Sequence, residues 1–387
     1  MSNTFVNDIL PVIMERLGDE REQKMHAFVL SLVSGNKNKV SPAQKIELGV
    51  FAAAKGYLDI LSWLLDEGAV GPECLEAAAA NDQRCAIELL RWRGVAWPAN
   101  GLVGASANGR LEIMDLARQS GCRFGPECIE AAAASNHKEV VAWIRSSIER
   151  TRWPELGLVG ACGNGHIDLV RWAYANGCGF QPECIDAAAE TNRKDVIEYL
   201  VYTVRVPWPR NGLVGAAHMG HCDMMRWCLN RGCGYDTTTI ASAARGGRVD
   251  ILELFGAHTD LPKDMSYASL RAAMNGHLGL IEWLDCKDLW YDCDQTLQTA
   301  AFMGHLHIVQ YLVSKGCEPS HKTATDAVPR GNVDVIKWLA SNGYPVDVDE
   351  CVKQCEKLRK LSPHRAHDRK LVSVLEFLKT FRYDCKI

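Results

Sequence analysis

The sequence contains no unbroken run of eighteen apolar residues, so it lacks the length of apolar chain that a membrane-spanning helix requires. It also lacks an excess of either charge, because 43 Lys and Arg oppose 47 Asp and Glu, giving a formal net charge of -4. This balance gives no support to a nucleic-acid or anionic-membrane partner. Asp8 interrupts the apolar stretch that a signal peptide would need. We therefore expect a soluble, cytoplasmic protein.

Motifs that announce common catalytic sites are missing as well. The sequence contains no G-x-S-x-G, no H-E-x-x-H and no phosphate-cradling glycine loop. His305 and His307 with Cys317 form the one local set that a metal ion could use, and their spacing matches no zinc pattern. We expect no enzymatic activity, no cofactor and no metal.

Cysteine, by contrast, is abundant, with sixteen residues. Most of them recur at equivalent places in a repeated sequence; Cys128 and Cys184, for example, lie in the copied phrases GPECIEAAA and QPECIDAAA. Their number therefore reflects duplication more than pairing, and we expect free, reduced thiols, as in a reducing compartment.

One phrase returns along most of the chain: a run of small residues, a turn residue, a periodic apolar stretch and a Gly. The turn residue is Gly, Asn or Asp, and it recurs at intervals of 26 to 29, giving eleven units. The turn residues are Gly56, Asp82, Gly109, Asn136, Gly165, Asn192, Gly220, Gly247, Gly276, Gly304 and Gly331. A longer period of 54 to 56 residues is superimposed, because PEC returns at Cys74, Cys128 and Cys184, and Trp-Pro followed by GLVGA returns at Trp97, Trp153 and Trp208.

Each unit is predicted to be a pair of short antiparallel helices, A and B. Gly, Asn and Asp accept the left-handed conformation that closes a helix, so the turn residue separates the two. Helix A is rich in alanine, which lets neighbouring units approach closely. Seven positions after the turn residue, eight of the eleven units carry an aromatic residue, as at Trp63 and Trp172, which we expect on or beside the buried stripe of helix B.

These units resemble the ankyrin repeat, whose second half reads roughly G-H-x-E-V-V-x-L-L-L-x-x-G-A. This chain has GHIDLVRWAYANGC and GHLHIVQYLVSKGC at that place, and the resemblance covers about residues 45 to 345. The units are shorter than the roughly 33 residues of ankyrin repeats, so the projecting β-hairpins should be shortened or lost. In their Trp-rich and Cys-rich style they resemble arrays encoded by giant DNA viruses of amoebae, which would place the protein in the host cytoplasm.

The resemblance implies an all-α, ankyrin-type solenoid of about eleven helix-pair repeats with capping helices at both ends. The predicted organisation is an N-terminal segment over residues 1–42, the repeat array over 43–345 and a C-terminal helical cap over 346–387. A solenoid needs such caps because its terminal repeats would otherwise expose their apolar faces.

The N-terminal segment has two interpretations. FVNDILPVIMERL resembles the opening of an F-box, a module that docks on the adaptor of a cullin-based ubiquitin ligase, and Phe5, Ile9, Ile13 and Leu17 occupy its apolar places. Alternatively, the same stretch is an amphipathic helix that caps the first repeat.

The ankyrin resemblance implies a monomeric scaffold that binds a partner protein through its concave and loop surface. Trp97, Trp153 and Trp208, each in a Trp-Pro loop between units, and Trp290 at a related position are the partner-binding candidates. Proline prevents helix continuation, so these rings should lie off the helix B stripe, either at the rim of the array or stacked within it.

Overall fold

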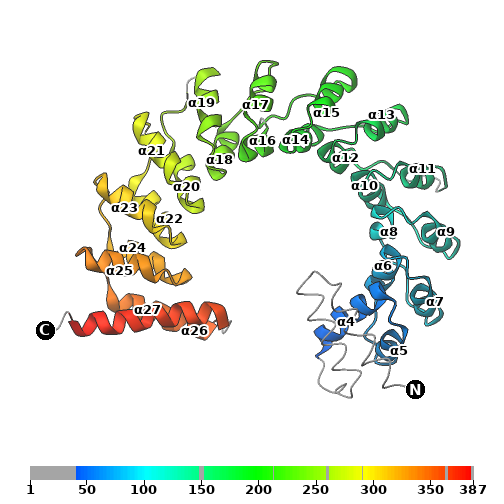
Figure 1. Ribbon diagram of the computed structural model, residues 1–387, viewed down its shortest axis with the longest axis horizontal. Coiled ribbons are helices and arrows are strands. Elements are labelled where there is room, and N and C mark those ends of the chain that lie inside the picture. The colour runs from blue at the N-terminus through cyan, green and yellow to red at the C-terminus, as the bar shows by residue number, and fades with distance from the viewer. Residues whose placement is uncertain are drawn as a thin grey trace, which may run out of the picture. The chain divides into compact units, whose positions relative to one another are not determined.

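The computed structural model describes residues 41–147, 152–211, 213–258, 261–289, 291–361 and 365–384. Within these ranges the regular elements are all helices, and eleven pairs of helices follow one another along the chain (Figure 1). The all-α, repeated arrangement predicted from the sequence is therefore confirmed.

The chain divides into two compact units. The first comprises the described residues up to Ala161 together with His166–Gly179, and the second comprises Cys162–Gly165 and the described residues from Phe180 onward. Helix α12 (Val159–Asn164) is shared between the two.

In the first unit, helices A and B alternate along the chain. The A helices are α4 (Pro42–Lys55), α6 (Pro72–Ala80), α8 (Val103–Ala107) and α10 (Pro126–Ala134). The B helices are α5 (Leu58–Asp66), α7 (Arg84–Trp92), α9 (Leu111–Gln119), α11 (Lys138–Ser147) and α13 (Ile167–Ala175).

The second unit continues the pattern. Its A helices are α14 (Pro182–Glu190), α16 (Val214–Met219), α18 (Thr237–Arg245), α20 (Ser266–Asn275), α22 (Cys293–Met303) and α24 (His321–Ala327), extended by the 3₁₀ turn η3 (Val328–Arg330). Its B helices are α15 (Lys194–Glu198) with its π-helical continuation η2 (Tyr199–Val204), α17 (Cys222–Leu229), α19 (Val249–His258), α21 (Leu278–Cys286), α23 (Leu306–Ser314) and α25 (Val333–Ser341). Two longer helices, α26 (Val348–Leu361) and α27 (Arg365–Asp384), follow and contact η3 and α25.

The turn residues adopt the backbone conformation that the sequence predicts. All eleven have positive φ, including the non-glycine residues Asp82 (58°), Asn136 (62°) and Asn192 (61°). Such angles are costly for most side chains, which is why the position accepts Gly, Asn and Asp.

In the part of the chain that has the 54 to 56 residue period, repeats with a long helix A alternate with repeats that have a short one. The long form has nine residues, as in α6 and α10, and begins at the proline of PEC. The short form has five or six residues, as in α8 and α16, and begins only after the Trp-Pro loop. The loop therefore replaces the first turn of helix A in every second repeat.

A buried carboxylate joins each long A helix to the short one that follows within the same compact unit. Glu130 Oε1 accepts a hydrogen bond of 2.6 Å from the backbone N–H of Gly160, and Glu76 accepts one from Gly104. A Cβ atom at Gly160 would lie 2.6 Å from the Cβ of Ala134, so a larger residue would push the helices apart. The GLVGA phrase thus keeps its second glycine because the neighbouring helix A approaches so closely.

The second oxygen of Glu130 is buried without a hydrogen-bond partner, and burial raises the pKa of this carboxyl. The folded protein therefore holds this proton more tightly than the unfolded chain does, so Glu130 favours folding at low pH and this contribution is lost as pH rises through the raised pKa. Glu130→Gln keeps an acceptor for Gly160 and carries no charge. We expect its unfolding free energy at pH 7 to equal that of the parent or exceed it by about 1 kcal/mol.

The measurement is urea denaturation at several pH values, with Glu130→Ala as the control that removes the acceptor. A Glu130→Gln variant as unstable at pH 7 as Glu130→Ala would show that the carboxylate charge itself holds the Gly160 amide.

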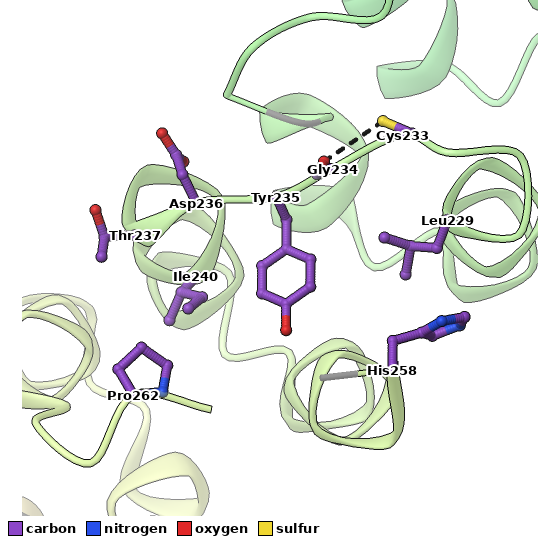
Figure 2. A pocket seen from close by; sticks show the side chains of 9 residues that line it. All are labelled: Leu229, Cys233, Gly234, Tyr235, Asp236, Thr237, Ile240, His258 and Pro262. Carbon is purple, nitrogen blue, oxygen red and sulfur yellow. Dashed lines mark hydrogen bonds between the residues drawn. The ribbon is translucent and has the colours of Figure 1, made fainter. Parts of the chain in front are cut away.

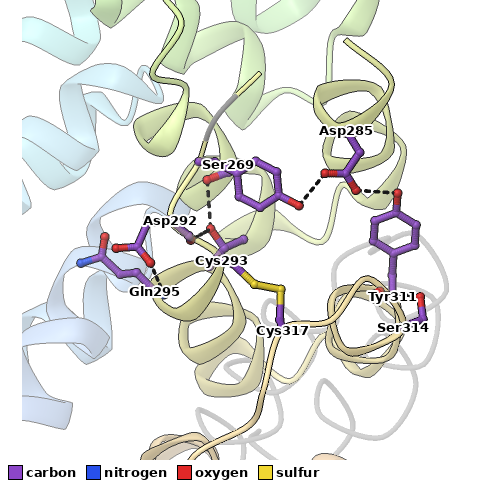
Figure 3. The surroundings of a disulfide bond; sticks show 10 residues. Ser269, Asp285, Asp292, Cys293, Gln295, Tyr311, Ser314 and Cys317 are labelled. Atoms are coloured by element: carbon purple, nitrogen blue, oxygen red, sulfur yellow. Dashed lines mark hydrogen bonds between the residues drawn. A yellow bond between two sulfur atoms is a disulfide. The ribbon is translucent and has the colours of Figure 1, made fainter. Parts of the chain in front are cut away.

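The described cysteines are mostly packing groups. Burial raises the pKa of the Cys74 and Cys128 thiols to about 11, so they remain protonated at neutral pH. The expectation of free thiols is wrong for one pair, since Cys293 and Cys317 form a disulfide between the start of α22 and the segment after α23 (Figure 3). Cys293 has no counterpart in the other repeats, so the duplication argument never applied to it.

Candidate protein-binding surface

The first two Trp-Pro loops share a tight turn that precedes a short A helix. In the first loop the N–H of Gly101 donates to the carbonyl of Pro98 over 3.1 Å, and Gly157 repeats this bond to Pro154. Gly101 has φ = 80°, and a Cβ there would lie 2.6 Å from the carbonyl oxygen of Arg123. The chain must therefore place glycine where the loop meets the next repeat.

In two of the three Trp-Pro loops the tryptophan ring packs against the helix B aromatic of its own repeat. Trp153 meets Trp172 edge to face with 6.3 Å between ring centroids, and Trp208 meets Trp227 in the same way at 6.5 Å. Trp153 Nε1 also donates to the carbonyl of Asn176 over 3.2 Å. Trp97 packs beside the core of the first repeats.

Three repeats that lack a Trp-Pro loop carry another aromatic at the same place, twelve residues before the turn residue: Phe124, Phe180 and Tyr235. Phe124 meets Trp143 edge to face at 5.6 Å, and Tyr235 stacks on Phe255 at 4.1 Å. The sequence interpretation missed this equivalence, although the constant distance from the turn residue was a signal that could have revealed it.

Basic side chains lie over two of the loop tryptophan rings. Arg91 lies 5.0 Å from the Trp97 ring centroid, and Arg145 lies 4.7 Å from that of Trp153. Such cation–π contacts contribute about 0.5–1 kcal/mol each at exposed sites. All three loop tryptophans are half-buried, so part of each side chain remains accessible to solvent.

The helix B aromatics are half-buried in the same way. Of the eight expected on or beside the buried stripe, only Trp283 is fully buried. The fully buried positions of a B helix are aliphatic, as with Leu61 and Leu64 of α5. The rings therefore lie beside the stripe, where they meet the loop aromatics.

Several predicted site residues lie outside the described residues. They are Trp290 and the F-box-like candidates Phe5, Ile9, Ile13 and Leu17.

A row of exposed side chains on the A helices was not predicted. Two residues before the turn residue, the first unit has alanine in every complete repeat, whereas three successive repeats of the second unit have Arg245, Met274 and Phe302. Met274 and Phe302 are exposed, as is Tyr267 two turns before Met274. The signal in the sequence was the loss of alanine from one repeat position.

A hollow of about 550 Å³ lies between α17, α18 and α19 (Figure 2). Cys233, Tyr235, Ile240, His258 and Pro262 line it. Tyr235 projects into it and donates its hydroxyl hydrogen to the carbonyl of Phe255. Burial raises the pKa of the Cys233 thiol to about 12, which disfavours the thiolate that a nucleophile needs.

The described residues contain no cluster of three or more His, Cys, Asp and Glu side chains placed to hold a metal ion. Among the helices described, none combines the length and apolarity needed to cross a membrane.

The geometry defines a helical repeat protein, and the comparisons bear on the type of repeat. Residues 269–313 match the family of ankyrin repeats (many copies). The chain is 29% identical over 144 residues to Ankyrin repeat and KH domain-containing protein mask-1 of Caenorhabditis elegans, which covers 33% of this chain and 6% of that protein. These two matches support an ankyrin-type repeat protein.

Solved structures with a similar trace belong to the pentatricopeptide repeat protein PPR10. The complex with an 18-nt psaJ RNA element is 15% identical, covers 95% of this chain and 71% of that one, and has a TM-score of 0.28. PPR10 from maize is 13% identical, covers 92% and 68%, and has a TM-score of 0.27. With TM-scores this low, we infer neither fold nor function from the likeness.

Proposed function

We propose that the chain is a protein-binding scaffold that presents the exposed side of its A helices, together with the adjoining loops, to a partner protein. Ankyrin repeats indicate a protein-interaction module, and that match carries the proposal. The A helices bury alanines such as Ala78 and Ala79 against their neighbours, and their remaining face forms a row of exposed side chains. Repeat arrays use extended surfaces of this kind for binding.

In this proposal the protein is monomeric and cytoplasmic, with no catalytic chemistry or cofactor of its own. The test is affinity capture from native cells with the purified full chain as bait, followed by measurement of binding with the isolated partner. We expect one or more proteins to form a complex of defined stoichiometry with a monomeric chain. Failure of every captured protein to bind in purified form would overturn the proposal.

A second candidate function is substrate recognition for a cullin-type ubiquitin ligase. The apolar pattern of Phe5, Ile9, Ile13 and Leu17 supports it. If residues 1–42 are the docking half, we expect the ligase adaptor to co-purify with the full chain and to be lost when these residues are deleted. Retention of the adaptor by the shortened chain, or its absence from both preparations, would contradict a docking role for residues 1–42. The scaffold function would then stand without the ligase function.

A further inference from the structure

One surface of the second unit differs in chemistry from the rest of the A-helix row. We define the Arg–aromatic patch as six side chains of neighbouring A helices: Arg245 of α18, Tyr267, Arg271 and Met274 of α20, Phe302 of α22 and Arg330 of η3. Helix α20 contacts both α18 and α22, and α22 contacts η3, so the six side chains come from helices that lie next to one another. Figure 1 shows these helices side by side, from green to orange.

The apolar part of the patch is exposed. Tyr267 is 52% exposed, Phe302 38% and Met274 36%. At the register position of Met274 and Phe302 the first unit has Ala54, Ala80, Ala107 and Ala134, which present almost no side chain to a partner. Large exposed apolar residues gathered on one surface mark an interaction site.

Two of the three arginines of the patch contact rings. Arg271 Nη2 donates to the hydroxyl of Tyr267 over 2.6 Å, and its guanidinium lies 4.9 Å from that ring centroid. Arg330 lies 5.0 Å from the centroid of the Phe302 ring. Among the described residues, no ion pair joins Arg245, Arg271 or Arg330 to a carboxylate. A guanidinium that stacks on a ring keeps N–H donors in its own plane, and these match a carboxylate.

Two carboxylates of the helices that carry the patch lie near it. Asp326 lies one helical turn before Arg330, and burial raises the pKa of its carboxyl. Asp294 lies at the start of α22, near the end of the helix away from Phe302. The charges beside the apolar side chains are therefore mainly positive.

We infer that the Arg–aromatic patch binds a segment of a partner protein in which Asp or Glu alternates with apolar side chains. The inference rests on the proposed scaffold function and names the chemistry of its partner. Carboxylates would meet the arginines, and apolar side chains would pack on Met274, Phe302 and Tyr267. Single-stranded nucleic acid fits less well, because three arginines are few for a phosphate backbone and thioether and phenyl surfaces favour apolar side chains.

The test begins with selection of a phage-displayed library of random peptides on the immobilised full chain. We expect enrichment of peptides that combine net negative charge with Leu, Phe or Trp. Synthetic copies should lose about tenfold or more in affinity for the double variant Arg271→Glu/Arg330→Glu. The matched control is Arg226→Glu/Arg231→Glu, in which Arg231 stacks on Trp227 at 4.3 Å on the B-helix side of the same unit. This control should bind as the parent does.

Three outcomes would overturn the inference. Enriched peptides that are neutral or basic would exclude the acidic chemistry. Acidic peptides that bind both double variants equally would place the site elsewhere, while leaving the scaffold proposal intact. Binding of an oligouridylate that the patch variant loses, without any enriched peptide, would assign the patch to nucleic acid. Circular dichroism and thermal melts of both variants would exclude unfolding as the cause of lost binding.

Discussion

Replacing Gly101 with alanine is expected to lower the free energy of unfolding by about 3 kcal/mol, which combines the cost of a left-handed residue with that of a steric clash. Gly101 has φ = 80°, and its new Cβ would lie 2.6 Å from the carbonyl oxygen of Arg123 and 3.0 Å from Cys128 Sγ. The obstructing oxygen belongs to the backbone, so no side-chain rotation relieves the contact. The loop or helix α10 must move instead.

Gly94 supplies the matched control, because it has φ = 83° and a Cβ there would meet no atom within 4 Å. Gly94→Ala should lower the free energy of unfolding by about 1 kcal/mol, because only the left-handed backbone is unfavourable and no steric clash is added. The two variants are compared by urea denaturation followed by tryptophan fluorescence. Equal losses of unfolding free energy in the two variants would mean that the loop can shift to avoid the clash. Glycine at position 101 would then be needed only for the left-handed backbone of the turn.

This glycine shows what the sequence could and could not predict. The helix pairs and their number followed from the turn residues, because a left-handed position restricts the choice to Gly, Asn and Asp, and all eleven positions adopt that conformation. The longer period was also visible in the sequence. The sequence did not show that in every second repeat of this period a Trp-Pro loop replaces the first turn of helix A. That replacement depends on contacts between neighbouring repeats, which the sequence of one repeat does not contain.

The candidate binding surface was less predictable than the fold. The sequence pointed to Trp97, Trp153 and Trp208 because proline removes them from helix B, but it could not show that Trp153 packs on Trp172. In the sequence, Arg271 and Tyr267 could not be distinguished from other helix residues, because which side chains face solvent depends on burial in the folded protein. Cys293 does not recur in the other repeats, so the repeat pattern could not predict its disulfide with Cys317.

Replacing Trp153 with alanine is expected to lower the free energy of unfolding by about 2 kcal/mol, roughly half the cost of removing a fully buried aromatic ring. The variant loses the contact with Trp172, the cation–π contact with Arg145 and the hydrogen bond to the carbonyl of Asn176. Trp92→Ala is the control, because Trp92 is 79% exposed and its loss should change stability by no more than about 0.5 kcal/mol. Equal stability of the two variants would contradict a packing role for Trp153.

Replacing the loop tryptophans with phenylalanine distinguishes a role in packing from a role in partner binding. The sequence itself suggests this substitution. Phe124 occupies the place of Trp153 one repeat earlier and meets Trp143 at 5.6 Å, so Trp153→Phe should retain most of the packing. We expect the triple variant Trp97→Phe/Trp153→Phe/Trp208→Phe to remain folded and to bind the partner more weakly. Tryptophans near the centre of an interface contribute roughly 2 kcal/mol or more each, and the three rings are only half-buried. Unchanged partner affinity in this folded variant would assign the three rings to packing alone and leave the A-helix row as the binding surface.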